Sequence, residues 1–444
     1  MSMANKRVRV GLVGFGTVGT GVAKLLCDDA DAIEARTGLR IELAAVVDID
    51  TTSPRPVKLP EGVLTDDLDK LLNDESIQIG IELVGGTTVA KDIQLKMLAA
   101  GKDVVTANKA LLAECGTELY AAARAAGRCI AFEASCAGGI PIISAIRTGL
   151  AANRIEAIYG ILNGTCNYIL SNMSKKGEDF PAALIKAQKK GYAEADPTLD
   201  INGADSAHKL AILATLGFGY EIKLDDIMVE GIEKISIDDV RYGREMGYVL
   251  KLLAIGQKDA DGKVSLRVHP SFISPDSPLG RVNGPFNAVS ILSHAVGQTM
   301  YYGRGAGMMP TASAVVADII EVAIGNSAKL FNSLQIRPRE KADSVISNID
   351  NLVSRFYIRL MAKDEPGVLA CHSKILGDHN ISISGALQRE GSGPQNTVPV
   401  VITTHPTKQK NMSAALAELA KLDNVGAEPV CIRIVNIPED KVDD

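Results

Sequence analysis

The chain has 444 residues, of which 46% are hydrophobic and 23% charged, and its formal net charge is −6. This length predicts about two to four domains, and the composition is that of an ordinary α/β protein. No block of Lys or Arg indicates nucleic-acid binding, and no apolar run reaches the roughly 18 residues of a membrane span. The N-terminal residues lack the apolar segment of a signal peptide.

The seven cysteines are scattered and form no C-x-x-C pair, and the six histidines form no H-x-x-x-H pattern. These patterns favour reduced thiols and disfavour a zinc-dependent enzyme. We therefore expect a cytoplasmic protein without a zinc site.

A glycine-rich turn follows the first predicted strand. Gly14, Gly16 and Gly19 fit the pattern G-x-G-x-x-G, and a helical pattern follows over 20–26. Glycine is needed here for a tight turn, for close approach to a pyrophosphate and for helix–strand packing, and the helix N-terminus attracts the phosphates. The alternative is a purely structural turn. The predicted cofactor-binding residues are Gly14, Phe15, Gly16, Thr17, Val18 and Gly19.

The second predicted strand, 41–47, ends at Asp48. A carboxylate at this position can accept hydrogen bonds from the ribose hydroxyls of an adenosine, which favours NAD. Arg55 follows in a proline-flanked loop, where it is either a partner for the 2′-phosphate of NADP or a solvated charge. NAD is favoured and NADP remains open.

The next elements alternate between strand and helix. Strands are predicted over 77–84, 104–107 and 129–132, and helices over 66–73, 90–100 and 114–126. This alternation predicts a Rossmann-type, doubly wound parallel sheet over 1–138, completed by an apolar helix around 311–330. Ligands of such sheets sit at the carboxyl ends of the strands, where this chain carries Gly85, Gly86, Asn108, Lys109 and Glu133.

Residues 139–310 mix strands and helices and are predicted to form an α+β substrate-binding domain. Asp205 and Lys209 are four residues apart on a predicted helix, so they share one face. They form either a surface ion pair or a lysine oriented by a carboxylate to protonate an alkoxide. Glu194 is a candidate for binding a substrate ammonium, and Lys109 is a second candidate cation near the nicotinamide; each could instead be a solvated charge.

The C-terminal part has a third pattern. Residues 331–352 are predicted to be a linker, and 353–438 follow the order strand, helix, strand, strand, helix, strand. The strands are predicted over 356–361, 381–383, 397–403 and 430–435, and a hairpin loop over 390–396. This βαββαβ order is that of a ferredoxin-like unit.

Taken together, these motifs resemble homoserine dehydrogenase over nearly the whole chain. The segments that carry the resemblance are 14–19, 106–110, 133–134, 138–143, 163–169, 191–197 and 205–209. The resemblance implies reversible NAD(P)-linked interconversion of L-homoserine and L-aspartate 4-semialdehyde. It also implies that the chain is the monofunctional form, without an aspartokinase portion.

The resemblance also implies roles for individual residues. Lys209 would be the proton donor in the reductive direction, assisted by Lys109. Glu194 would hold the amino group of the substrate, helped by Asp200 and Asp205.

The family binds a monovalent cation, Na⁺ or K⁺, and this implies a site at Glu133 and the carbonyls of Cys136, Gly138 and Ile140. Carbonyl oxygens suit a hard cation. The alternative for Glu133 is a buried carboxylate bonded to N–H groups of that loop. Gly303 would approach the nicotinamide end of the cofactor.

Residues 364–369 resemble the start of an ACT domain, a module that senses small molecules. The resemblance implies L-threonine as a feedback effector in threonine, methionine and isoleucine biosynthesis. It also implies a homodimer or homotetramer, with 163–168 in the substrate domain's sheet at the dimer interface. Val47 stands where many relatives carry an arginine, which weakens a preference for NADP.

Two other functions stay open from the residues alone. One is another NAD(P) oxidoreductase that acts on a small amino acid or its semialdehyde. The other is a regulator that binds a nucleotide or an amino acid without turnover. Such a regulator would need none of Lys109, Glu194, Asp205 and Lys209, so their joint presence favours an enzyme.

Overall fold

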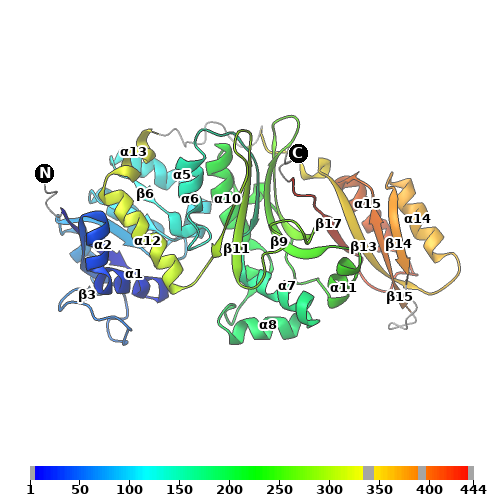
Figure 1. The fold of residues 1–444 in the computed structure, drawn as a ribbon, viewed down its shortest axis with the longest axis horizontal. Helices are drawn as coiled ribbons and strands as arrows, with labels where there is room; N and C mark the ends of the chain where they lie inside the picture. Colours follow the sequence, from blue (N-terminus) through cyan, green and yellow to red (C-terminus); the bar gives the residue numbers. More distant parts are fainter. Residues whose placement is uncertain (1–5, 334–344, 389–396, 439–444) are drawn as a thin grey trace.

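The computed structural model describes residues 6–333, 345–388 and 397–438. The molecule is elongated: a sheet built from the N-terminal residues lies at one end, a second sheet lies in the middle, and the C-terminal strands and helices lie at the other end (Figure 1).

The N-terminal sheet is entirely parallel, with strand order β3-β2-β1-β4-β5-β6. This is the strand order of a Rossmann dinucleotide-binding fold, and it confirms the predicted doubly wound sheet. The order reverses between β1 and β4, which opens a crevice at their carboxyl ends. The strands are β1 (Lys6–Val13), β2 (Leu39–Val47), β3 (Leu64–Thr65), β4 (Ile77–Glu82), β5 (Asp103–Thr106) and β6 (Ile130–Ala131).

Helices cover this sheet, and one of them begins earlier than its apolar pattern indicated. Helix α5 starts at Lys109 instead of Glu114 because Asn108 caps it: the Asn108 side chain accepts a hydrogen bond from the N–H of Leu111 at 3.2 Å. Lys109 therefore lies in the first turn. The helices are α1 (Thr17–Asp28), α2 (Ala30–Thr37), α3 (Asp69–Leu72), α4 (Val89–Ala99) and α5 (Lys109–Ala125).

Two later helices return to the N-terminal sheet: α12 (Met308–Ala323) and α13 (Asn326–Ser333). Helix α12 crosses α1 so closely that a Cβ on Gly21 would lie 3.0 Å from the Cβ of Ala312. Helix α13 occupies the start of the stretch predicted to be a linker, and most of the remainder lies outside the described residues.

The described helices are short or interrupted by polar residues. None alone is long and apolar enough to cross a membrane. Helices α12 and α13 meet the criteria of length and composition only when taken together, across a bend of 80°.

The central part combines a mixed sheet with helices on one side. Its strands are β7 (Ile155–Ile161), β8 (Met228–Val229), β9 (Val249–Lys258), β10 (Val264–Ile273), β11 (Phe286–Ser293) and β12 (Gly297–Arg304). Its helices are α6 (Ile142–Ser144), α7 (Gly164–Lys176), α8 (Phe180–Lys189), α9 (Thr198–Ile201), α10 (Ala204–Phe218) and α11 (Ile237–Glu245).

One expectation for this part is wrong. Residues 163–168 do not belong to the sheet, because they form the cap and first turns of α7. The side chain of Asn163 accepts a hydrogen bond from the N–H of Cys166 at 2.8 Å, and this cap starts the helix despite the β-forming residues that follow.

The C-terminal part has the predicted ferredoxin-like topology. Its four main strands lie in the order β17-β13-β15-β14, which is 4-1-3-2 in chain order. Strand β14 begins at Ile383, two residues later than the predicted strand, and the predicted hairpin loop over 390–396 lies outside the described residues. The elements are β13 (Val353–Lys363), α14 (Val368–Asp378), β14 (Ile383–Gln388), β15 (Thr397–Thr404), β16 (Thr407–Lys408), α15 (Gln409–Leu419) and β17 (Val430–Ile434).

The C-terminal strands continue the central sheet. Strands β10 and β17 pair in parallel, with Ser271 opposite Arg433, so a single sheet runs from β12 to β14. Across this junction the fully buried carboxylate of Asp239 in α11 accepts hydrogen bonds from Arg359 Nε at 2.6 Å and from the Tyr357 hydroxyl at 3.0 Å. The two parts therefore share one sheet and a buried ion pair.

Replacing Asp239 with Ala is expected to destabilise the protein by about 3–5 kcal/mol, because Arg359 would be left buried without its partner. The matched control is Asp238→Ala, which removes an exposed ion pair with Arg241 at 3.1 Å and should cost about 1 kcal/mol or less. Urea unfolding of both variants tests this, and equal midpoints would contradict it.

Candidate active site

Glycine is required at the three positions of the N-terminal turn for different structural reasons. Gly14 has φ +96°, and a Cβ there would lie 2.7 Å from the carbonyl oxygen of Leu83. A Cβ on Gly19 would overlap the carbonyl oxygen of Gly14. Gly16, in contrast, has no other heavy atom within 4 Å of its Cβ position. The fold thus explains Gly14 and Gly19, and the open space at Gly16 is what close approach of a phosphate requires.

Asp48 is tied to this turn. Its carboxylate accepts hydrogen bonds from the N–H of Phe15 and, at 2.8 Å, from the N–H of Asp50. Because an ionised carboxylate offers about four acceptor positions, Asp48 keeps capacity for ribose hydroxyls.

Arg55 lies over the same turn. Its Nε donates to the carbonyl of Phe15 at 3.3 Å, its guanidinium carbon lies 5.2 Å from the centroid of the Phe15 ring, and Nη2 lies 3.8 Å from Asp48. Arg55 is therefore held beside Asp48 and is not a loose surface charge. Because Asp48 favours the ribose hydroxyls of NAD and the adjacent Arg55 suits the 2′-phosphate of NADP, this arrangement is compatible with either cofactor.

The carboxyl end of β4 carries a buried acid that sequence reasoning missed. Glu82 accepts hydrogen bonds from the N–H of Val84 at 2.8 Å and from the Thr106 hydroxyl at 2.8 Å. Asn108 holds the next turn, since its Nδ2 donates to the carbonyl of Gly86 at 2.7 Å. An acid at the end of an apolar strand is the signal that could have identified Glu82.

The centre of the site is the buried carboxylate of Asp205, in the first turn of α10. It forms ion pairs with Lys209 Nζ at 2.7 Å and with Lys109 Nζ, and it accepts a hydrogen bond from Asn163 Nδ2 at 2.9 Å. Burial alone would raise the pKa of Asp205, but the two lysines outweigh it and hold this pKa well below its usual range. The two predicted lysines and the predicted acid thus meet in one cluster.

The two lysines are held differently. Lys209 Nζ also donates to the carbonyl of Leu162 at 2.8 Å, so two of its three N–H donors are engaged and its side chain is only 9% exposed. The side chain of Lys109 is 40% exposed. Burial alone would lower the pKa of Lys109, but Asp205 outweighs this and raises it. Both lysines therefore contact one carboxylate, Lys209 from a buried position and Lys109 from a partly exposed one.

Besides Asp205, two acids were predicted to bind substrate, and one of them joins this cluster. Asp200 accepts a hydrogen bond from Asn163 Nδ2 at 2.7 Å, and its pKa is raised because burial disfavours its charged form. Glu194 is exposed on the loop between α8 and α9. Asn163, whose amide joins Asp200 to Asp205, was not predicted as a site residue, because the resemblance implied that 163–168 belong to the sheet.

Glu133 is buried and caps α6. Its carboxylate accepts hydrogen bonds from the N–H groups of Ile143 and Ser144, both at 2.8 Å, and from the Ser144 hydroxyl. Its own N–H donates to Asp318 of α12 at 2.7 Å. Burial raises the pKa of Glu133. This is the alternative arrangement considered for Glu133, bonded to nearby N–H groups.

The loop after Glu133 lies against the end of β12. The N–H of Gly139 donates to the carbonyl of Arg304 at 3.0 Å, and a Cβ on Gly138 would lie 2.6 Å from the carbonyl oxygen of Gly305. A Cβ on Gly303 would lie 3.1 Å from Ile140. Three predicted residues, Gly138, Ile140 and Gly303, are thus neighbours.

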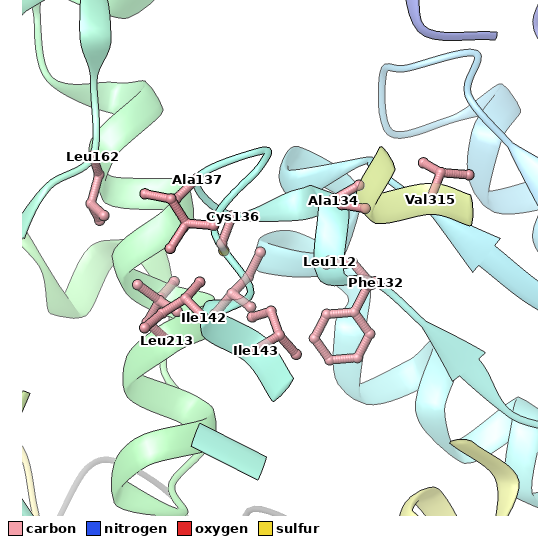
Figure 2. Close-up of a cluster of buried hydrophobic side chains, with 14 of the residues drawn as sticks. Leu112, Phe132, Ala134, Cys136, Ala137, Ile142, Ile143, Leu162, Leu213 and Val315 are labelled. Atoms are coloured by element: carbon pink, nitrogen blue, oxygen red, sulfur yellow. The ribbon is translucent and has the colours of Figure 1, made fainter. Parts of the chain in front are cut away.

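An apolar cluster supports this loop from behind. Figure 2 shows Cys136, Ala137 and Ile142 between Leu213 of α10 on one side and Phe132 on the other. All are buried and belong to one continuous core. Hence the N-terminal sheet and the central part are joined by close apolar packing.

Side chains that could ligate a metal ion are not grouped in this structure as a metal site would require, within the described residues. Within residues 6–333, 345–388 and 397–438, no group of three or more His, Cys, Asp or Glu side chains could hold a metal ion.

Comparison with known proteins matches nearly all of the chain to one family. The model "Homoserine dehydrogenase, NAD binding domain" matches residues 14–133, and the model "Homoserine dehydrogenase" matches residues 141–320. The homoserine dehydrogenase of Neisseria gonorrhoeae is 42% identical to this chain over 435 residues, and that of Pseudomonas aeruginosa is 43% identical over 434 residues. Each alignment covers 97% of this chain and 99% of the relative.

Solved structures agree. The crystal structure of a homoserine dehydrogenase from Thiobacillus denitrificans has a TM-score of 0.88 at 41% identity and covers 97% of this chain and 99% of that one. A hyperthermophilic archaeal homoserine dehydrogenase in complex with NADPH has a TM-score of 0.58 at 25% identity, covering 72% of this chain and 98% of that one.

The glycine turn yields a paired prediction. Gly16→Ala should fold normally, because its Cβ meets open space, but it should weaken NADH or NADPH binding at least tenfold by filling the room for the pyrophosphate. Gly19→Ala should lower the melting temperature, because its Cβ overlaps the Gly14 carbonyl. Fluorescence titration of the reduced cofactor and thermal melts test both. Normal cofactor binding by a folded Gly16→Ala variant would contradict the assignment of this turn.

Proposed function

Because this chain belongs to the homoserine dehydrogenase family of NAD(P)-dependent oxidoreductases, we propose that it reduces L-aspartate 4-semialdehyde to L-homoserine, with Lys209 as the proton donor and Asp205 as the residue that orients Lys209. Residues 14–19 would hold the cofactor together with Asp48 and Arg55, and Lys109 and Gly303 would lie toward its nicotinamide. When bound, the dinucleotide supplies the hydride that reduces the carbonyl carbon. The single observation that carries the proposal is the ion pair of Lys209 with the buried Asp205.

Lys209 suits the role of proton donor. As hydride arrives at the aldehyde carbon, negative charge develops on the oxygen, and a fixed ammonium can stabilise that charge and donate a proton. Asp205 and the Leu162 carbonyl fix two N–H groups of Lys209, which leaves one N–H for the substrate oxygen. In the reverse direction, neutral Lys209 would take the proton back from the hydroxyl of homoserine.

The substrate would be oriented by the charges around this pair. Lys109 is the more exposed lysine, which suits contact with the substrate oxygen or carboxylate. Asp200 is held next to Asp205 through Asn163, so together they offer negative charge to the substrate ammonium. Glu194 would complete this set from its loop. The Thr165 hydroxyl supports this placement, since it anchors the loop by donating to the Tyr192 carbonyl.

A monovalent cation, Na⁺ or K⁺, would bind at the loop that follows Glu133. The ligands would be Glu133 and the main-chain carbonyls of Cys136, Gly138 and Ile140, since Glu133 Oε1 accepts one hydrogen bond, from the Ile143 N–H, and keeps a further acceptor position. Hard oxygen ligands of this kind suit such a cation. Its contribution would be to fix the loop against Gly303, beside the nicotinamide.

The ferredoxin-like C-terminal unit would be an ACT domain that mediates feedback inhibition by L-threonine. The arrangement that supports regulation is the shared sheet, because β17 of this unit pairs with β10 of the substrate-binding part. Strands β12 and β14 end the sheet and offer edges for pairing, which supports a homodimer or homotetramer. Feedback by threonine would place the enzyme in threonine, methionine and isoleucine biosynthesis.

Lys209→Ala should lower kcat by about 10²–10⁴-fold, the usual contribution of a general acid, with cofactor affinity unchanged. Lys186→Ala, which removes an exposed lysine paired with Glu178, is the control and should keep full activity. Oxidation of NADH and NADPH with L-aspartate 4-semialdehyde gives the rates. A Lys209→Ala variant with normal kcat would exclude Lys209 as the proton donor.

Feedback inhibition is best tested in the full chain. Deleting residues 353–438 would uncover β10, and Tyr357 and Ile434 belong to the same buried core as Phe272. L-Threonine should inhibit the native protein, and Asp364→Ala, in the loop between β13 and α14, should weaken inhibition at least tenfold without changing uninhibited turnover. Asp378→Ala, at an exposed position in α14, is the matched control.

Either of two results would argue against this assignment. Turnover that L-threonine does not affect at any concentration would remove threonine as the effector and leave the dehydrogenase chemistry intact. Inhibition that is equally strong in Asp364→Ala and in the native protein would separate the effector from that loop.

A further inference from the structure

A cavity of about 510 Å³ lies where the central sheet meets the C-terminal unit. On one side it is lined by the end of the β9–β10 hairpin, where Lys258, Asp259 and Asp261 contribute charged side chains, and on the other by residues 351–355 and the end of β17. This junction of β9, β10, β13 and β17 lies in the middle of the elongated molecule (Figure 1). The cavity is separate from the cluster around Asp205.

The cavity contains a buried arginine without an anionic partner. Arg267 of β10 is 4% exposed, and no carboxylate of the described residues lies within ion-pair distance of it. Its Nη1 donates to the Ser265 hydroxyl at 2.8 Å and its Nη2 to Gln257 Oε1 at 3.1 Å. Its Nε has no hydrogen-bond partner among the described residues. Three of the five N–H donors of the guanidinium group are thus unused.

Strand register shows that the polar groups of this cavity share one face of the sheet. Ser265 lies opposite Gln257, Arg267 lies opposite Ile255, and Ile255 lies opposite Tyr159 of β7. Side chains opposite one another in a sheet point to the same side. Arg267 is therefore set among the Ser265 hydroxyl, the Gln257 amide and the Tyr159 ring, all of which line the cavity.

A second buried arginine nearby is the useful contrast. Arg433 of β17 is equally buried, but its guanidinium forms an ion pair with Glu230 at 2.7 Å and hydrogen bonds with Gln409. At this junction Arg433 therefore has a carboxylate partner, whereas among the described residues Arg267 has none. Burial lowers the pKa of Arg267 to about 10, and the nearby charge of Arg433 acts in the same direction.

We propose that this cavity is a receptor for a small oxyanion, a carboxylate or a phosphate, and that Arg267 binds the anion through the N–H groups of Nη1 and Nη2 that Ser265 and Gln257 leave free. The planar guanidinium fork matches the two oxygens of either group, and a charge-assisted pair of this kind is strong in a buried site. Ser265 and Gln257 keep the guanidinium plane oriented before the ligand arrives. A bound anion would contact both β10 and the C-terminal unit, so it would stabilise their junction.

The proposal explains a residue that is otherwise costly. A buried charge without a partner is unfavourable, and an apolar side chain of similar length normally fits such a position at least as well. If Arg267 serves a ligand, Arg267→Met should leave the melting temperature of the ligand-free protein equal or higher. Arg433→Met is the matched control and should lower it, because it removes the ion pair with Glu230 together with the hydrogen bonds to Gln409.

Binding is measured on the full chain by calorimetry and thermal melts with three probes: sodium acetate, L-threonine and inorganic phosphate. Sodium chloride at equal ionic strength is the reference. At least one probe should bind to the native protein and raise its melting temperature, and Arg267→Met should weaken that binding at least tenfold. Binding of acetate or L-threonine identifies a carboxylate as the ligand, whereas binding of phosphate alone identifies a phosphate.

Two results would overturn the proposal. One is that none of the three probes binds to the native protein at concentrations up to tens of millimolar. The other is that binding is equally tight in Arg267→Met, since the anion would then occupy another site, such as the turn at Gly16. Neither result bears on catalysis, which the Lys209→Ala variant tests separately. If L-threonine inhibition is lost in Asp364→Ala but kept in Arg267→Met, feedback inhibition does not act through this cavity.

Discussion

The site depends on one buried carboxylate that two parts of the chain share. Asp205 belongs to α10 of the central part, whereas one of its lysine partners, Lys109, belongs to α5 of the N-terminal sheet. The other partner, Lys209, lies one turn further along α10. A buried carboxylate is stable only when it is paired, so the two parts must meet with Lys109 at Asp205. The same contact that joins the two parts thus positions both ammonium groups.

A second layer fixes this cluster from the side of the sheet. The Leu162 carbonyl, directly after β7, accepts hydrogen bonds from Lys209 and from Asn287 of β11, both at 2.8 Å. Strand β7 pairs with β9, β9 with β10, and β10 with β17 of the C-terminal unit. The orientation of Lys209 is therefore a property of the same sheet that the C-terminal unit extends. A unit docked elsewhere on the surface would lack this connection.

Local signals allowed much of the fold to be predicted, and residues with distant partners were missed. Gly14 and Gly19 form a pattern within six positions, and the parallel sheet follows from alternating strands and helices. The resemblance implied that Asn163 belongs to the sheet. The residues alone did not reveal its partners Asp200 and Asp205, because these lie 37 and 42 positions away, and its role as a helix cap is visible only once α7 is placed. The pairing of β10 with β17 is longer in range still, and no local pattern in either strand encodes it.

Contacts between residues far apart in the sequence also explain why α12 packs against the N-terminal sheet. Asp318 of α12 accepts the N–H of Glu133, while α12 also packs across α1, the helix that begins at the glycine turn. One helix therefore contacts the element that starts at Gly16 and the element that leads to Gly138. Because Gly138 and Gly139 lie against the end of β12, which continues into α12, the chain closes a ring around the carboxyl edge of the sheet. Helix α12 therefore connects the glycine turn and the loop after Glu133, the two segments at the edge where the cofactor is proposed to bind.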